Sequence, residues 1–387
     1  MTTTGIRIQG ATLPPACETL RQEVREFVQS AIADGLFVPG CDRWLGGFDP
    51  QFSRRLAQQG WLGMTWPKQY GGHERSALER FVVTEELLAV GAPVAAHWVG
   101  DRQTGPTLLR FGTERQKREI LPHLASGERF FAIGMSEPGS GSDLASVRTR
   151  ADKVDGGWVV NGTKVWTSNA HRSHYFIILC RTAERTQDRH AGLSQLIIDL
   201  SAPGLEIRPI PLLTGAHHFN EVVMKNVEVP DDMVVGEIGN GWQQVTSELA
   251  YERSGPERFL STLPLLSAYL THLRDRQAPS DTRVTAIIGR LAARLAALRA
   301  MSVGIAAALD RGEAPEIEAA LVKDLGTRFE SELTDTLREL DDCRPDLAGD
   351  ELERLFAEAI LHAPGFTLRG GTNEILRGVV ARGLGLR

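Results

Sequence analysis

Two glycine- and hydroxyl-rich segments carry the residue types that could bind a flat polar ring. Residues 132–145 read AIGMSEPGSGSDLA, and residues 161–169 read NGTKVWTSN. Pro138 and Gly139 favour a tight, non-helical loop, whose backbone N–H groups can converge on an anion or on ring carbonyl oxygens. Trp166 adds a large flat ring on which another ring could stack. With the hydroxyls of Ser136, Ser142, Thr167 and Ser168, the segments therefore predict a site for a polar heterocycle.

Other motifs in the chain match known sites only in part. The spacing Gly139-Ser-Gly141 begins like a dinucleotide fingerprint, but Leu144 stands where the third glycine would be, and no βαβ pattern surrounds it. Residues 157–164 have the glycine spacing of a P-loop, yet Thr163 precedes Lys164, the reverse of the required order. We interpret the remaining candidates as surface or turn histidines rather than zinc ligands, namely His171, His174, His217 and His218.

The composition is that of a soluble globular protein, with 387 residues, 42% hydrophobic and 24% charged. The net charge of −6 argues against a nucleic-acid partner. We find no apolar run near the ~20 residues that a membrane span needs, and no signal peptide at the start of the sequence. The four cysteines are far apart, so we expect no metal site and a reducing, cytoplasmic location.

The elements that position these segments follow a helical–β–helical order. Apolar residues at helical spacing predict helices over residues 18–32, 78–90 and 113–124 in the first third. Between them, residues 60–72 form a glycine- and aromatic-rich connection. Short β-type runs separated by turns follow in the middle, and helical periodicity returns after Gly239. The runs are residues 130–136, 157–160, 174–180, 193–200 and 221–229, and the later helices are residues 241–251, 260–274, 283–309, 316–340 and 350–362.

This order predicts an α+β chain of three domains. A helical domain spans residues 1–127, a middle β-barrel or sandwich spans residues 128–236, and a helical bundle of the four-helix type spans residues 237–387. The Ala- and Leu-rich stretch 291–309 could pack within this bundle or against another subunit.

The two polar segments and the domain order resemble the acyl-CoA dehydrogenase family over nearly the whole chain. The resemblance implies FAD as cofactor and oxidation of an acyl thioester to its 2,3-enoyl product, with the β-hydride passing to flavin N5. It also implies that Ile133 to Ser136 run along the flavin, with an apolar contact from Met135. Gly141 and Ser142 would approach the pyrophosphate, and Ser142 the thioester. The other flavin face would be lined by Trp166, Thr167 and Ser168.

The family's catalytic base is usually a glutamate in a Tyr-Glu-Gly-Thr segment near the C-terminus. Here the corresponding residues 369–374 read RGGTNE, so Gly370 stands in the glutamate's place and cannot accept a proton. Some relatives, isovaleryl-CoA dehydrogenase among them, carry the base on the first helix of the C-terminal domain. That register implies Glu252 as the base, and burial beside the substrate would raise its pKa. The resemblance assigns Thr372 and Glu374 to cofactor contacts, and Tyr251 and Arg253 to the substrate site.

The resemblance leaves several points open. The family's Arg-x-x-Phe-Gly motif is missing, so Arg274, Arg276 or Arg283 could each be a pyrophosphate ligand or a solvated helix charge. The acyl group could be carried by CoA or by a carrier protein, and the electron acceptor could be an electron-transfer flavoprotein or another protein. We expect a homo- or hetero-oligomer, a dimer or tetramer. Two alternatives to the dehydrogenase remain, a non-catalytic partner subunit and a flavin oxidase or monooxygenase on the same fold.

Overall fold

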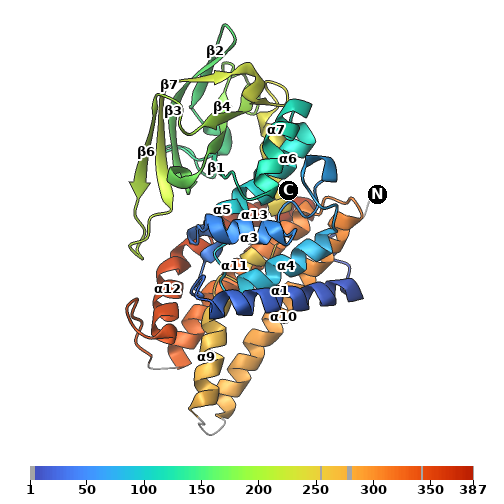
Figure 1. Cartoon of the computed structure of the whole chain (residues 1–387), viewed down its shortest axis with the longest axis vertical. Helices are drawn as coiled ribbons and strands as arrows, with labels where there is room; N and C mark the ends of the chain where they lie inside the picture. The colour runs from blue at the N-terminus through green and yellow to red at the C-terminus, as the bar shows by residue number, and fades with distance from the viewer. Residues whose placement is uncertain (1–4, 253–254, 277–280, 341–342, 387) are drawn as a thin grey trace. The chain divides into compact units, whose positions relative to one another are not determined.

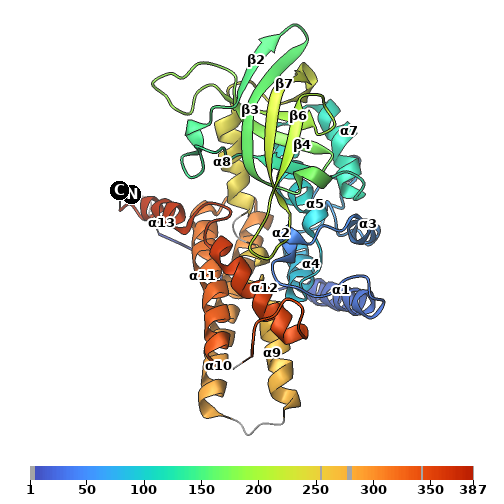
Figure 2. The ribbon, with the colours of Figure 1, turned by 90° about the vertical axis from the view of Figure 1, so that its left-hand side faces the viewer.

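The computed structural model describes residues 5–252, 255–276, 281–340 and 343–386, without the side chains of residues 248–252. The chain forms two compact units. One comprises residues 1–44, 76–93 and 250–387 and is helical, and the other comprises residues 45–75 and 94–249 and contains the β-sheet. Figures 1 and 2 show both units from two sides.

The β-containing unit is built on one eight-stranded sheet with the order β6-β7-β3-β2-β4-β5-β8, and β1 pairs with β4 in parallel. Figure 2 shows β2, β3, β7 and β6 following one another across the sheet. The strands are β1 (Phe131–Gly134), β2 (Arg150–Val154), β3 (Gly157–Ser168), β4 (Tyr175–Arg181), β5 (Leu193–Asp199), β6 (Leu205–Ile210), β7 (Phe219–Pro230) and β8 (Val234–Val235).

Strand β4 is buried on both faces, and this explains its nearly continuous apolar sequence. Phe176 and Ile178 pack into a core formed among the strands. Ile177, between them, packs with Trp66 and Leu121 into a second core under the helices. Because successive side chains of a strand point to opposite faces, the helices of this unit cover one face of the sheet. They are α3 (Pro50–Gln58), α5 (Ala95–Val99), α6 (Gly105–Phe111) and α7 (Glu114–Ala125), with a π-helical turn at Gly100–Thr104 and a 3-10 turn, η1, at Lys68–Tyr70.

The helical unit packs its helices around shared apolar faces. Near the N-terminus, α1 (Pro15–Ala33) lies against α4 (Ala77–Ala89), and α4 lies against α10 (Thr282–Asp310). Further along the chain, α11 packs against α10, α12 and α13, and α12 packs against α9. These are α9 (Leu263–Asp275), α11 (Glu316–Leu340), α12 (Glu351–Phe366) and α13 (Asn373–Gly383), and two helices cross between the units, α2 (Arg43–Gly46) and α8 (Gly241–Glu252).

The predicted helical–β–helical order is confirmed, and the predicted segments correspond to elements of the structure. For the strongly periodic helical segments, the predicted and observed ends differ by a few residues. Strands β2, β6 and β8, and helices α2, α3, α5 and α6, were not predicted, and of α13 only the start, at Glu374, was expected. Strand β2 is exposed at four of its five positions, so it carries no apolar alternation. Strand β6 is a short edge strand in which Leu205 and Ile207 alternate with Glu206 and Arg208, and this alternation was missed.

Helix α10 is long and apolar enough, by length and composition, to cross a membrane. This corrects the expectation that no apolar run approaches that length. However, 44% of its most apolar window is buried inside the protein, and core helices of bundles have the same composition. The feature is therefore weak support for a membrane span.

Candidate cofactor and substrate site

The structure brings together the two polar segments singled out in the sequence. The N–H of Val165 donates to the carbonyl of Ser136 at 2.9 Å. The Lys164 ammonium donates to the carbonyl of Met135 at 3.1 Å. The end of β1 and the middle of β3 are therefore joined through backbone atoms, and Met135 and Ser136 lie next to Val165 and Trp166.

Gly134 allows this close approach. A Cβ atom at this position would lie 2.3 Å from the ring of Phe176 and 3.1 Å from Cγ of Lys164. Real Cβ atoms do not come so close to an aromatic ring, so any side chain at residue 134 would displace β1 from β4 and β3. The glycine is thus required by packing beneath the candidate site.

A buried ion pair holds the loop that follows β1. The Lys164 ammonium, with no exposed side-chain surface, lies 2.8 Å from Oε1 of Glu137. Glu137 also accepts hydrogen bonds from the backbone N–H groups of Arg148 and Thr149, at 2.6 and 2.9 Å. Burial by itself would raise the pKa of Glu137, but Lys164 and these hydrogen bonds hold that pKa below its usual value. The carboxylate is therefore ionised and ties the loop to β3.

At the end of β3 the side chains have the properties expected of a ring-binding surface. Trp166 is 57% exposed, and its backbone has φ of 58°, a left-handed conformation that is uncommon for a residue other than glycine. Its ring meets Phe219 edge-on at a centroid distance of 6.0 Å. Next to it, the hydroxyl of Thr167 is buried and has no hydrogen-bond partner within the described part of the chain. A flavin edge would supply a partner for this hydroxyl, so the residues present fit a flavin.

The loop after β1 is a tight turn, as predicted. Glu137 and Ser140 exchange backbone hydrogen bonds of 2.8 and 3.0 Å across Pro138 and Gly139. Beyond the turn, Gly141 and Ser142 are exposed, and a Cβ on Gly141 would meet open space. On the inner side, Met135 is half-buried and packs against the cluster of Val147, Leu179, Leu193 and Val245, together with Leu144 and Trp242.

In the helical unit, Lys323 fixes the turn that precedes α13. Its buried ammonium donates to the carbonyls of Thr367 and Gly371 at 3.2 and 2.8 Å, and to Oδ1 of Asn373 at 2.7 Å. Thr372 is the N-cap of α13, with its hydroxyl accepting from the N–H of Ile375 at 3.4 Å. Glu374 lies exposed in the first helical turn, where backbone and Thr372 hydrogen bonds lower its pKa. The expected helix start is therefore present.

The position that holds the family's usual base is closed by an arginine. Gly370 has φ of +66°, and a Cβ there would lie 2.8 Å from Nη1 of Arg258. The Arg258 side chain is fully buried, and its guanidinium lies 5.1 Å from the ring centroid of Trp44. A side chain at residue 370 would contact this guanidinium. The glycine therefore provides no base and also leaves room for Arg258.

Around this turn lies a cluster of buried charges. Arg369 pairs with Asp42 and donates to the hydroxyl of Ser261 at 2.8 Å. Its guanidinium also lies 3.5 Å from Glu330, whose carboxylate accepts from the N–H of Ser261 at 2.8 Å. Burial raises the pKa of Glu330 to about 7, against the lowering effect of Arg369. The cluster anchors the backbone of residue 369 beside Gly370.

The proposed base and two substrate residues are not placed by the structure. Glu252 is the last residue of α8, but its side chain lies outside the described residues. The side chain of Tyr251 and the whole of Arg253 also lie outside them. Arg274 and Arg283 lie near facing ends of α9 and α10, with Arg276 just after α9.

The histidines form no metal site in the part of the chain that the structure describes, where no three metal-ligating residues cluster. His171 and His217 stack on each other with ring centroids 4.1 Å apart. Burial and the neighbouring His217 lower the pKa of His171 to about 4, so this imidazole is neutral near pH 7.

Comparisons with known proteins agree with this geometry. Three family models match consecutive parts of the chain: the acyl-CoA dehydrogenase N-terminal domain at residues 14–128, the middle domain at residues 132–227 and the C-terminal domain at residues 239–385. The chain belongs to the acyl-CoA dehydrogenase family. It is therefore an FAD-dependent oxidoreductase that acts on the CH–CH group of an acyl-CoA.

Individual members of the acyl-CoA dehydrogenase family match nearly end to end. Acyl-CoA dehydrogenase IpdE1 of Mycobacterium tuberculosis is 36% identical over 390 residues, covering 95% of this chain and 97% of the relative. The Tcur3481-Tcur3483 steroid ACAD superposes with a TM-score of 0.85 at 32% identity, covering 96% of this chain and 97% of that one. The ChsE4-ChsE5 complex of M. tuberculosis has a TM-score of 0.81 at 29% identity, covering 98% and 99%.

Several residues of the site carried no signal in the sequence. Lys164, Glu137, Lys323 and Arg258 are charged residues of the kind usually found on a surface, and each is buried here. The contacts described above join residues that are distant in sequence; Lys323 and Thr367, for example, are 44 positions apart. A local pattern could not have identified them, because only folding creates these pairs.

Proposed function

We propose that this acyl-CoA dehydrogenase introduces a 2,3 double bond into the ring-bearing acyl chain of a CoA thioester, with Glu252 as the base. The observation that supports the proposal is the backbone hydrogen bond between Ser136 and Val165, which joins the segment after β1 to β3 one residue before Trp166, whose side chain is exposed. FAD bound there would accept a hydride from the β-carbon of the substrate. Trp166 and Met135 would contact its ring system, and the unpartnered Thr167 hydroxyl would hydrogen-bond to its edge.

Two parts of the helical unit would act on the α-carbon side of the substrate. The Glu252 carboxylate would take the α-proton, because Gly370 has no side chain to do so. The N–H of Gly370 would donate to the thioester oxygen and share the charge that develops there. Lys323 and Arg369 hold the backbone on both sides of Gly370, so this donor is positioned before the substrate binds.

The ring-bearing acyl chain is inferred from the Tcur3481-Tcur3483 steroid ACAD, which is 32% identical over nearly the whole chain. A panel of thioesters tests it by anaerobic reduction of the flavin: a steroid-derived acyl-CoA, a straight-chain acyl-CoA, and the same acyl groups on a carrier protein. We expect the steroid-derived CoA ester to reduce the flavin fastest. Faster reduction by the straight-chain ester would contradict the substrate class, and faster reduction by the carrier-protein esters would contradict CoA as the carrier.

Substitution of Glu252 by Gln tests the base. Gln keeps the shape of the side chain but accepts no proton, so we expect flavin binding and substrate affinity to persist. The rate of flavin reduction should fall about 10²–10⁴-fold, the usual contribution of a general base. Glu374→Gln is the control, because Glu374 is exposed in the first turn of α13; its flavin should be reduced at nearly the wild-type rate, apart from any loss of cofactor affinity. Reduction of Glu252→Gln at the wild-type rate would exclude Glu252 as the base.

A second candidate function is that of a partner subunit without its own turnover. Two observations favour it. Arg258 lies against the position of the usual base, and two similar solved structures, ChsE4-ChsE5 and Tcur3481-Tcur3483, are each named after two different chains. Purification of this chain alone separates the two functions. A homo-oligomer with a full complement of FAD that oxidises substrate by itself would exclude the partner role, and a colourless, inactive chain would support it.

A further inference from the structure

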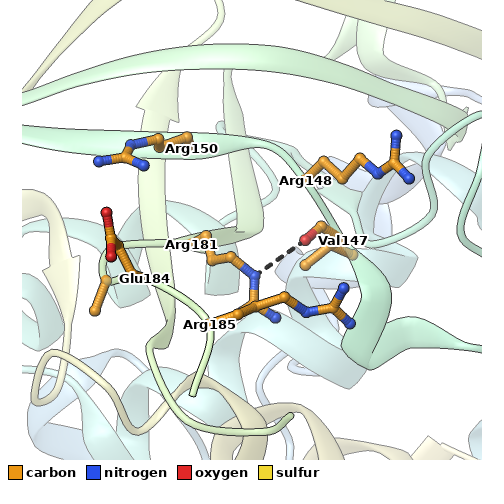
Figure 3. Close-up of a pocket in the computed structure, with 7 residues that line it drawn as sticks. Val147, Arg148, Arg150, Arg181, Glu184 and Arg185 are labelled. Atoms are coloured by element: carbon orange, nitrogen blue, oxygen red, sulfur yellow. Dashed lines mark hydrogen bonds between the residues drawn. The ribbon is translucent and has the colours of Figure 1, made fainter. Parts of the chain in front are cut away.

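A cavity in the β-containing unit is lined mainly by arginine side chains, which the candidate cofactor site does not use. Its volume is about 470 Å³, within the range of small-molecule sites. Figure 3 shows Arg181 between Arg150 and Glu184 on one side and Arg148 and Arg185 on the other. The remaining lining residues are Val147 and Ala183.

The charge of this cavity is opposite to that of the whole protein. Four arginines and one glutamate line it, whereas the chain as a whole has a net charge of −6. Arg150 is paired with Asp152 at 2.5 Å. Arg148 and Arg185 are exposed and form no ion pair with any other residue that the structure describes. Positive charge is therefore available to a ligand.

The floor of the cavity is a buried arginine held by neutral groups. The guanidinium of Arg181 donates to the carbonyls of Val147, Ala145 and Ala191 at 3.2, 2.9 and 3.2 Å. Residue 181 is 8% exposed. Burial lowers the pKa of Arg181, and the nearby charge of Arg185 lowers it further. A bound anion would offset this unfavourable electrostatic environment.

The topology of the sheet brings residues that are distant in sequence to this cavity. Arg150 at the start of β2 pairs with Arg181 at the end of β4 in the parallel ladder between these strands. Glu184 and Arg185 follow in the loop after β4.

We propose that this arginine cavity is a binding site for a ligand with clustered phosphates. Guanidinium groups match phosphate oxygens with two parallel hydrogen bonds. The two guanidinium groups of Arg148 and Arg185 at one cavity, unpaired among the described residues, favour a di- or triphosphate over a single carboxylate. Such a ligand could be the nucleotide end of the CoA thioester, which rests on the proposed function, or a free nucleotide.

The test measures binding of inorganic pyrophosphate and ADP to the holoenzyme by titration calorimetry. The variant is Arg148→Gln with Arg185→Gln, both exposed residues. The matched control is Arg54→Gln with Arg55→Gln, which removes the same charge from exposed positions on α3 that do not line the cavity. We expect the cavity variant to lose on the order of 10-fold or more in affinity, and the control about twofold or less. Equal binding by the two variants, or no binding to the unsubstituted protein, would overturn the proposal.

A second measurement separates the two sources of phosphate. The KM for flavin reduction is compared between an acyl-CoA and the same acyl group on pantetheine, which lacks the nucleotide. A KM that rises in the cavity variant only for the CoA ester identifies the nucleotide end of CoA, and an unchanged KM identifies a free nucleotide. If no thioester reduces the flavin, the proposed function fails while the pyrophosphate titration still decides the phosphate site.

Discussion

Gly370 combines a left-handed backbone with a buried guanidinium against its α-carbon. Both properties disfavour a side chain: a residue with a Cβ is strained at φ of +66°, and the Arg258 guanidinium would have to move away from the Cβ. A glutamate introduced here would meet Arg258, and the positive charge would lower the pKa of the new carboxyl and weaken it as a base. This is a physical reason for a base elsewhere in the chain, as proposed for Glu252.

Gly370→Ala should therefore destabilise the protein. We expect a loss of about 1–3 kcal/mol in the free energy of unfolding, from backbone strain and displacement of Arg258. Denaturant unfolding measures it, with Gly289→Ala as control. Gly289 lies inside α10 with open space around its α-carbon, so alanine there should be neutral or stabilise by up to about 1 kcal/mol. Equal stability of the two variants would show that Arg258 does not confine residue 370.

At the scale of the elements, the candidate site depends on how β1 and β3 are joined. Each strand has hydrogen-bonded neighbours in the sheet, but the loop after β1 is joined to β3 by the hydrogen bond from Val165 to Ser136 and by the pair of Lys164 and Glu137. The pair is buried, so its loss leaves an uncompensated charge in the interior. Loss of this pair should therefore disorder the loop after β1, the adjoining part of β3 and the candidate cofactor site together.

Glu137→Gln tests this link through pH. Because the folded pKa of Glu137 lies below its usual value, its stabilising effect is present at neutral pH and is lost as the pH falls through that folded pKa. We expect Gln to cost about 3 kcal/mol at pH 7, and the difference from the unsubstituted protein to shrink in acid. Glu206→Gln, at the exposed pair with Arg208, is the control and should cost less than about 1 kcal/mol. A cost that did not change with pH would argue against the ion pair as its cause.

At the scale of the whole molecule, the cofactor should contribute to stability. A ligand that binds only the folded protein stabilises it by about 2.7 kcal/mol at a concentration 100 times its Kd. Removal of FAD should lower the Tm, and added FAD should restore it in a concentration-dependent way, as measured by scanning calorimetry. A Tm independent of FAD would contradict the flavin site.

Light scattering on the same samples should give the mass of a dimer or tetramer, and a fully active monomer would contradict the predicted assembly.

Much of the architecture was predictable because it is encoded locally. Helical periodicity in segments such as residues 283–309 and 316–340 reflects one buried face of a helix. Helices α10 and α11 could therefore be predicted from the sequence. Strands β3, β4, β5 and β7 bury enough apolar side chains to be recognised as well. Strand β2 could not be, because it pairs through its backbone with β3 while four of its five side chains are exposed. Strand β6 was missed, although Leu205 and Ile207 alternate with charged residues and pack against the core of the sheet.

The sequence by itself determined the family, the two polar segments proposed to bind the flavin and the absence of a carboxylate at residue 370, since residue types and short spacings encode all three. Only the tertiary structure decided what surrounds them. It pairs Lys164 with Glu137, seats Lys323 under the turn before α13, closes the usual base position with Arg258 and gathers arginines from β2, β4 and the next loop around one cavity. These contacts join residues that are distant in the chain, and a charge is buried only when folding supplies its partners. No local pattern could therefore have predicted them.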